Sequence, residues 1–247
     1  MRVSPGNRAL RVGLVAVAGL LVLGCSVGAL RLWPFTSPLV TPPPPPLTPS
    51  PGTSLPGGWR EYREPDDGFA IALPDTWRRV DLDAPGQPAP LPAGDEGLWR
   101  PAGALAARVR GQGASGVRFF AFDLSPESVT SGFMTTVNVL HLPLSGAASL
   151  AEFGERNVRE LERAARVRRP MTQERVDLPA GQALRLRYEL TIDLAADEEL
   201  CLSLTQFLLV WAQQGYVLTF ATQPWQLEHY APLFDEIGRS LRWLQEE

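Results

Sequence analysis

The chain has 247 residues, of which 45% are hydrophobic and 20% are charged, a composition typical of a packed domain rather than of a wholly disordered chain. All 23 basic residues are Arg, so chemistry that needs a lysine, such as a Schiff base or a P-loop phosphate contact, is excluded. With two Cys and two His, the sequence also excludes a zinc ribbon and a disulfide-dense scaffold.

Charges and prolines are unevenly distributed along the chain. The net charge of −4 is the sum of +4 over residues 1–57 and −8 over residues 58–247. Ten of the 24 prolines lie between Pro34 and Pro56. The sequence therefore predicts three parts, which are a signal or anchor segment over 1–33, a proline-rich linker over 34–57 and a folded domain over 58–247.

The first part has the pattern of a membrane anchor. Three Arg lie among the first 11 residues, and residues 12–30 follow without a charge. At about 1.5 Å per residue in a helix, such a run crosses a hydrocarbon core of about 30 Å. Arg on the N-terminal side predicts that this end stays in the cytoplasm. We therefore expect a chain held at the cell membrane by one N-terminal anchor, with its C-terminal domain outside the cytoplasm.

Cys25 leaves a second kind of anchor open. The string Val22-Leu23-Gly24-Cys25 resembles the bacterial lipoprotein box, in which a small residue precedes a Cys that becomes lipidated. Leu23 is bulkier than the usual residue at its place, and the apolar run continues past Cys25. We therefore keep two alternatives, an uncleaved transmembrane helix over about 12–30 and a lipoprotein signal that ends at Cys25.

The second part, residues 34–57, is predicted to be a spacer. It contains the run Pro42–Pro46, and because each proline ring fixes φ at about −65° and removes a donor, the run favours a polyproline II helix. We expect a stiff stalk that holds the domain away from the membrane.

The third part alternates strand and helix patterns. A turn sequence, Pro65-Asp66-Asp67-Gly68, joins its first two predicted strands. The proline-rich residues 84–101 predict a surface excursion, and Leu105–Arg110 predict a short helix. Alternation and β-branched or aromatic content predict the strands, which are 59–63, 69–73, 117–124, 134–142, 172–178, 183–192, 200–211 and 216–222.

Two longer helices are predicted in the second half of this part. Ser149 and Glu152 form a capping box that starts a helix reaching to about Arg166, with Glu162 and Arg166 as one of its i,i+4 ion pairs. A last helix is broken or started afresh at Pro232. Helices segregated around an antiparallel sheet give an α+β fold class.

The residues of this domain resemble a known family. The string GFAIALPDTWRRV (68–80) resembles the opening hairpin of PsbP-like proteins, and FAFDL (120–124) with TTVNVL (135–140) resembles their next two strands. The helix that begins at the capping box and the ending LFDEIGRSLRW (233–243) are also similar to that family. The resemblance covers nearly all of the domain, and it implies a central antiparallel sheet sandwiched by helices.

The PsbP-like superfamily includes an extrinsic photosystem subunit, a Ran-binding nuclear factor and bacterial envelope lipoproteins, so the shared fold does not fix a function. The resemblance implies a binding or assembly module and brings no catalytic motif. Together with the anchor and the spacer, it predicts a membrane-anchored, extracytoplasmic binding or assembly-accessory module that is not an enzyme. Its expected partners are the membrane and an envelope protein or ligand, and no nucleic acid, because the domain is acidic and lies outside the cytoplasm.

Two rival functions remain open from the sequence. One is an envelope hydrolase that uses His141 or His229, although the chain has no GxSxG elbow. The other is a domain that binds a small apolar ligand between sheet and helix.

No cofactor or metal is expected, because the acidic turn Asp193–Glu199 lacks a calcium-loop pattern and is predicted to be a solvated hairpin tip. Cys201, in the string LCLSL, is predicted to be a buried thiol.

One run of basic residues is a candidate contact surface. Residues 156–175 contain seven Arg and only three Glu. On a tethered domain this excess favours contact with anionic headgroups or an acidic partner, and a solvated helix face is the alternative. The candidate residues are Arg159, Arg163, Arg166, Arg168 and Arg169.

Overall fold

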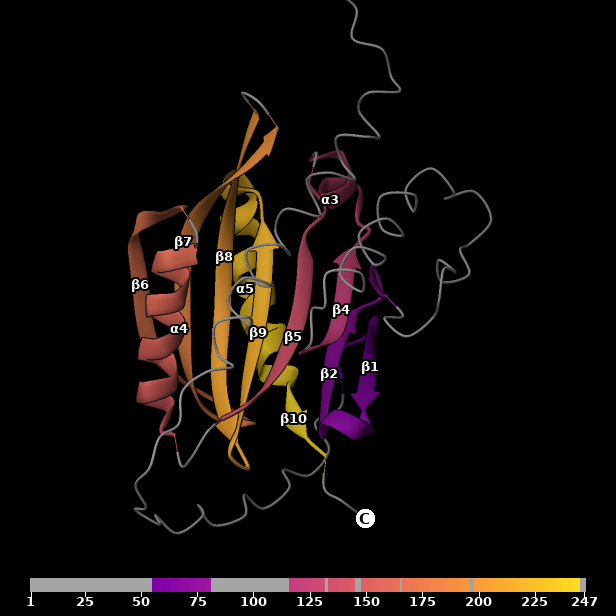
Figure 1. Ribbon diagram of the computed structural model, residues 1–247. Coiled ribbons are helices and arrows are strands. Elements are labelled where there is room, and N and C mark those ends of the chain that lie inside the picture. Colours follow the sequence, from indigo (N-terminus) through magenta and orange to yellow (C-terminus); the bar gives the residue numbers. More distant parts are fainter. Residues whose placement is uncertain are drawn as a thin grey trace, which may run out of the picture.

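Figure 1 shows a computed structural model of the chain. The structure describes residues 55–80, 116–131, 133–144, 148–164, 166–195 and 198–244. The predicted anchor with Cys25, nearly all of the predicted linker, the excursion over 84–101 and the short helix over 105–110 lie outside the described residues. Across the part of the chain that the structure describes, no helix combines the length and the apolar character that a membrane crossing needs.

The described strands form two antiparallel sheets. The smaller sheet has the order β1-β2-β10, and the larger one has the order β3-β4-β5-β9-β8-β7-β6. Its hairpin of β7 and β8 is the longest strand pair and projects beyond the other strands (Figure 1). The strands are β1 (Trp59–Glu64), β2 (Phe69–Pro74), β3 (Trp77–Arg79), β4 (Val117–Asp123), β5 (Thr136–Pro143), β6 (Arg166–Leu178), β7 (Gly181–Ala195), β8 (Glu198–Trp211), β9 (Gln214–Thr222) and β10 (Arg242–Trp243).

Helices cover the larger sheet on both of its faces. Helix α4 (Leu150–Ala164) lies on one face, and helix α5 (Leu227–Ser240) lies on the other (Figure 1). The small sheet shares the second face with α5, because β2 is buried along its length and packs into the same core as α5. The α+β class with a sandwiched antiparallel sheet is therefore confirmed, and the division into two sheets is new.

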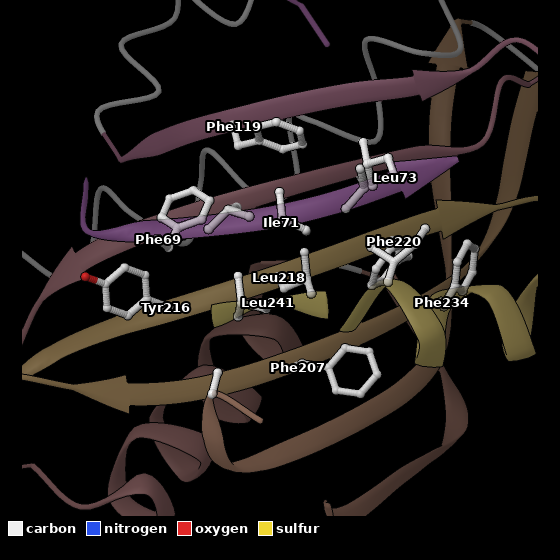
Figure 2. Packing of buried hydrophobic residues seen from close by; sticks show 14 of the residues in the cluster. Phe69, Ile71, Leu73, Phe119, Phe207, Tyr216, Leu218, Phe220, Phe234 and Leu241 are labelled. Carbon is white, nitrogen blue, oxygen red and sulfur yellow. The ribbon is translucent and has the colours of Figure 1, made fainter. Parts of the chain in front are cut away.

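The alternation of side chains along each strand supplies a core to both faces. In β8, Phe207 and Leu209 pack under α5, whereas Leu204 and Leu208 pack under α4. Figure 2 shows the core beneath α5, where rings and branched side chains from β2, β4, β8, β9 and α5 meet. The contact is close, because a Cβ on Gly238 of α5 would lie 3.2 Å from the Phe207 ring. Each large side chain buried here contributes about 1.5–3 kcal/mol of hydrophobic stabilisation.

The capping box of α4 is confirmed, but the predicted C-terminal end of the helix is wrong. The backbone N of Glu152 donates to Ser149 Oγ at 3.2 Å, and the backbone N of Ser149 donates to Glu152 Oε2 at 2.9 Å. The helix ends at Ala164, and Arg166 already begins β6. The predicted i,i+4 pair of Glu162 with Arg166 therefore has no helical geometry, and β6 starts six residues before the predicted strand.

Helix α5 is not interrupted at Pro232. It runs from Leu227 to Ser240 with Pro232 inside it. A proline removes the hydrogen bond to the carbonyl four residues earlier, which is that of Glu228 here. Glu228 and Pro232 are both exposed, so water can solvate that carbonyl, while Phe234 and Ile237 hold the following turns on the core. The prediction of a break failed because tertiary packing outweighs the local cost.

Candidate functional site

His141 and Asp67 form a histidine–carboxylate pair at the contact between the two sheets. His141 lies on β5, and Asp67 ends the 3₁₀ turn η2 (Pro65–Asp67) that joins β1 to β2. The distance from His141 Nδ1 to Asp67 Oδ1 is 3.0 Å, and Arg118 Nε of β4 lies 3.1 Å from the same oxygen. A negative charge held between two cationic or donor groups fixes the turn against the large sheet.

Tyr216 of β9 contacts both members of this pair. Its hydroxyl donates to the backbone carbonyl oxygen of Asp67 at 3.2 Å, and its ring stacks on the His141 imidazole with centroids 4.7 Å apart and planes within 4°. Burial, and then the negative charge of Asp67, raise the pKa of the Tyr216 phenol. The phenol therefore stays protonated at neutral pH and keeps its donor role.

Two tryptophans extend the ring contacts toward the end of the chain. The Trp243 ring lies 4.6 Å from that of Tyr216, and Trp211 stacks on Trp243 at 5.4 Å. The indole Nε1 of Trp243 donates to the carbonyl oxygen of Ala180 at 2.6 Å. Trp243 belongs to β10, so these contacts hold the last strand of the small sheet on β8 and β9.

Whether His141 can act as a catalytic base depends on what its second ring nitrogen, Nε2, contacts. A hydrolytic dyad needs Nε2 to face a nucleophile within hydrogen-bond reach. Here Nε2 is buried and, among the described residues, has no hydrogen-bond partner. The described residues therefore do not assemble a nucleophile with this histidine, and its bonds hold η2 and β9 in place.

His229, the other candidate base, lies elsewhere in the fold. It is exposed in the first turns of α5, where its ring packs edge-on against Tyr230 at 5.0 Å. No contact between His141 and His229 is found within the described ranges. The structure thus does not combine the two histidines into one site.

The five candidate arginines are divided between a helix and a sheet edge. On α4, Arg159 lies 3.5 Å from Glu155, and Arg163 lies 3.7 Å from Glu160. Because α4 carries four Glu and three Arg, this helix alone is not basic. The other three arginines lie in the first residues of β6, the strand at one end of the large sheet, and they are Arg166, Arg168 and Arg169.

The basic start of β6 also fits a structural role. Basic residues, a proline and irregular pairing are devices that keep edge strands from pairing with other chains. Residues 166–170 carry three Arg and Pro170, and the register with β7 shifts between Arg168 and Thr172. Arg168 NH1 also approaches Cys201 Sγ at 3.9 Å. Cys201 is only partly buried, which corrects the predicted buried thiol; it lies on β8, where it pairs with Thr191 of β7.

The acidic turn over 193–199 belongs to the hairpin of β7 and β8. Both strands run further than predicted, and Asp193 pairs with Glu199 in the register. Residues 196–197 at the tip lie outside the described residues. No group of three His, Cys, Asp or Glu that could hold a metal ion is found in the described part of the chain.

A buried polar network that the sequence analysis missed joins β4 to α5. Tyr230 OH donates to Asp123 Oδ2 at 2.5 Å. Ser125 donates to the same carboxylate through its hydroxyl at 2.6 Å and its backbone N at 2.9 Å. Burial, and then the hydrogen bond to Asp123, raise the pKa of Tyr230 to about 12. Ser125 before Pro126 was the available sequence signal, since that pair typically begins a helix, and here it caps α3 (Pro126–Thr130).

Comparison with known proteins places a PsbP protein among the similar structures. No family model matches the chain, and no curated protein is significantly similar in sequence. Among solved structures, the solution structure of cyanobacterial PsbP from Synechocystis has a TM-score of 0.45 and 15% identity, and it covers 81% of this chain and 99% of that one. A PsbP protein is thus one of the solved structures to which this chain is similar.

Two further solved structures are similar to this chain. A Pseudomonas aeruginosa protein of unknown function, PA94, described as a putative regulator, has a TM-score of 0.35 and 13% identity over 77% of this chain and 99% of that one. LpqN of Mycobacterium tuberculosis, described as involved in cell envelope biogenesis, has a TM-score of 0.42 and 10% identity over 76% and 93% of the two chains. These are distant likenesses, and no function is carried over from them.

Proposed function

We propose that this protein is a membrane-anchored, extracytoplasmic binding or assembly-accessory module that acts without catalysis. The order of an Arg-flanked apolar run, a proline-rich spacer and an acidic domain supports the location. The distant likeness to an envelope protein is compatible with this proposal but does not carry it.

The observation that carries the proposal is that the histidine–carboxylate pair is used for packing between the two sheets. His141 has Nδ1 on Asp67, one ring face on Tyr216 and Nε2 buried. A general base must instead reach the proton that it abstracts from a substrate. The pair therefore supports a rigid domain whose surface is presented to a partner, and it speaks against His141 as the base of a hydrolase.

A second contact is proposed for the basic residues. Arg159 and Arg163 of α4 are 56% and 71% exposed in their side chains, and the basic start of β6 follows directly in the chain. We propose that they meet the anionic surface of the membrane that holds the anchor. Replacing Arg159 and Arg163 by Gln should then reduce binding of the full chain to anionic vesicles and leave binding to neutral vesicles unchanged.

The experiment that tests the proposed function uses the native cells. Deleting the gene should alter the migration of an envelope complex in native electrophoresis, and the full chain should restore it. His141→Gln should also restore the complex, provided that the variant remains folded. A chain without residues 34–57 should fail to do so, because its domain cannot reach the partner. Turnover of ester, amide or phosphoester substrates that the wild type shows and a folded His141→Gln lacks would overturn the non-catalytic assignment.

A further inference from the structure

Trp225 is the most exposed large hydrophobic side chain in the described part of the chain. It is 68% exposed, and the other large hydrophobic residue that stands out to solvent there, Leu55, is 40% exposed. Trp225 lies in the 3₁₀ turn η3 (Pro224–Gln226), between β9 and α5. A Trp side chain buries a large apolar area on binding, and Trp is enriched among the residues that dominate the binding energy of protein interfaces. An exposed indole is therefore a candidate contact residue.

The turn that carries the indole is held by buried hydrogen bonds. The neighbouring Gln226 is 3% exposed; its Nε2 donates to the carbonyl oxygen of Glu127 at 3.0 Å, and its Oε1 accepts from Thr222 Oγ1 at 3.3 Å. Gln223 Nε2 donates to the carbonyl oxygen of Ser131 at 3.4 Å. Both flanking glutamines therefore bind the turn to the segment around α3.

A second layer of contacts fixes the same corner. Thr222 Oγ1 lies 2.9 Å from Thr135 Oγ1, and the backbone N of Thr135 donates to Ser128 Oγ of α3 at 2.8 Å. The Tyr230–Asp123 hydrogen bond described above ties α5 to β4 next to it. Because these hydrogen bonds already fix the backbone of the turn, binding of Trp225 costs little further conformational entropy, and more of the energy of burying the indole contributes to affinity.

The charge around the indole selects the kind of partner. Helix α3, the turn η3 and residues 227–232 of α5 contain two acids, Glu127 and Glu228, and no Arg or Lys. Both acids are exposed on the corner. Carboxylates beside an indole favour a cationic partner, since a guanidinium or ammonium is attracted both to the carboxylates and to the ring face. An anionic membrane surface is disfavoured at the same place.

We propose that η3 and the adjoining ends of α3 and α5 form a docking corner, in which Trp225 inserts into an apolar pocket of a protein partner that is flanked by Arg or Lys. This inference rests on the proposed binding function and adds to it the place and the chemistry of the contact. Trp225 is the anchor of the corner, and Glu127 and Glu228 orient the partner by its charge.

The test is site-specific photo-cross-linking with the full chain in its native cells. A photoreactive amino acid replaces His229, which is exposed beside the corner, and in a control chain it replaces Glu155 of α4, whose side chain is 70% exposed. We expect one discrete protein adduct from position 229 that falls at least 10-fold with Trp225→Ala and about 3- to 10-fold with Glu127→Gln and Glu228→Gln together. Peptide mapping of the adduct should find Arg or Lys close to the cross-linked residue.

The variants are suited to this test because Trp225, Glu127 and Glu228 are exposed, and equal thermal midpoints of the variants and the parent chain will verify that they fold. An adduct insensitive to Trp225→Ala, or a cross-link to lipid or glycan, overturns the docking corner. Adducts from position 155 alone also overturn it but leave the proposed binding function standing. The absence of an adduct from both positions contradicts the corner and the binding function together.

Discussion

Replacing Tyr230 by Phe tests whether the buried network between β4 and α5 stabilises the domain. The substitution removes the donor that lies 2.5 Å from Asp123 Oδ2, while the carboxylate keeps both of its bonds from Ser125. Asp123 is 2% exposed, so water does not readily replace the lost donor. A hydrogen bond to a charged group contributes about 1.5–3 kcal/mol. With two donors remaining, we expect a loss of about 2 kcal/mol, which lowers the melting temperature of a domain of this size by about 4–8 °C.

The pH dependence of this effect has a defined sign. The fold raises the pKa of Tyr230 from its ordinary value of 10.0 to about 12, so the folded state favours the protonated phenol. The stabilising contribution is therefore fully present below pH 10 and is lost as the pH rises toward 12. Urea unfolding of both chains at pH 8 and pH 11 should show a smaller difference between them at the higher pH.

Tyr62→Phe is the matched control for Tyr230→Phe. The Tyr62 hydroxyl donates to the carbonyl oxygen of Trp77 at the long distance of 3.5 Å, and a neutral bond of this kind contributes at most about 1 kcal/mol. If Tyr230→Phe costs no more than this control, or if its effect is the same at both pH values, the network does not stabilise the domain in the way argued here.

Three further predictions concern other parts of the chain. The hydroxyl of Tyr188 is buried without a hydrogen-bond partner in the described structure. Tyr188→Phe should therefore leave the free energy of unfolding, measured in urea, unchanged or raise it by about 1 kcal/mol. A decrease in the free energy of unfolding of more than about 1 kcal/mol would show that the hydroxyl has a partner. The turn between β8 and β9 places Ala212 and Gln213 at φ values of 47° and 62°, so replacing them by Asn and Gly, which favour such turns, should raise stability by about 1 kcal/mol, and a lower melting temperature would contradict the turn assignment. Metabolic labelling with a fatty-acid analogue should mark the wild type but not Cys25→Ala if the anchor is a lipoprotein signal, and an unlabelled wild type supports the uncleaved helix.

Features governed by neighbouring residues could be predicted from the sequence. The capping box of Ser149 and Glu152 and the turn over 65–68 are local, and both appear in the structure. The pattern of the long strands was also sufficient to identify the antiparallel hairpins over 181–222. The class of fold followed from these elements because few other arrangements bury all of their apolar faces.

Contacts between distant segments could not be predicted in the same way. His141 and Asp67 are 74 residues apart, and Tyr230 and Asp123 are 107 residues apart, so no spacing rule brings either pair together. The short strands β3 and β10 were also missed, because two or three residues carry no periodicity. The start of β6 at Arg166 was assigned to a helix because the local charge spacing continued the helical pattern past the point where the sheet takes over.

The position of β10 has a consequence for the order in which the domain folds. Arg242 and Trp243 pair with Ala70 and Phe69 of β2, and the backbone N of Leu244 donates to the carbonyl oxygen of Gly68. One of the first strands to be synthesised therefore completes its pairing only with a segment more than 170 residues later. Such non-local pairing slows the closure of a fold. A chain that is synthesised N-terminus first can complete its small sheet only after residues 242–244 have been added, so the domain cannot finish folding before its last residues are made.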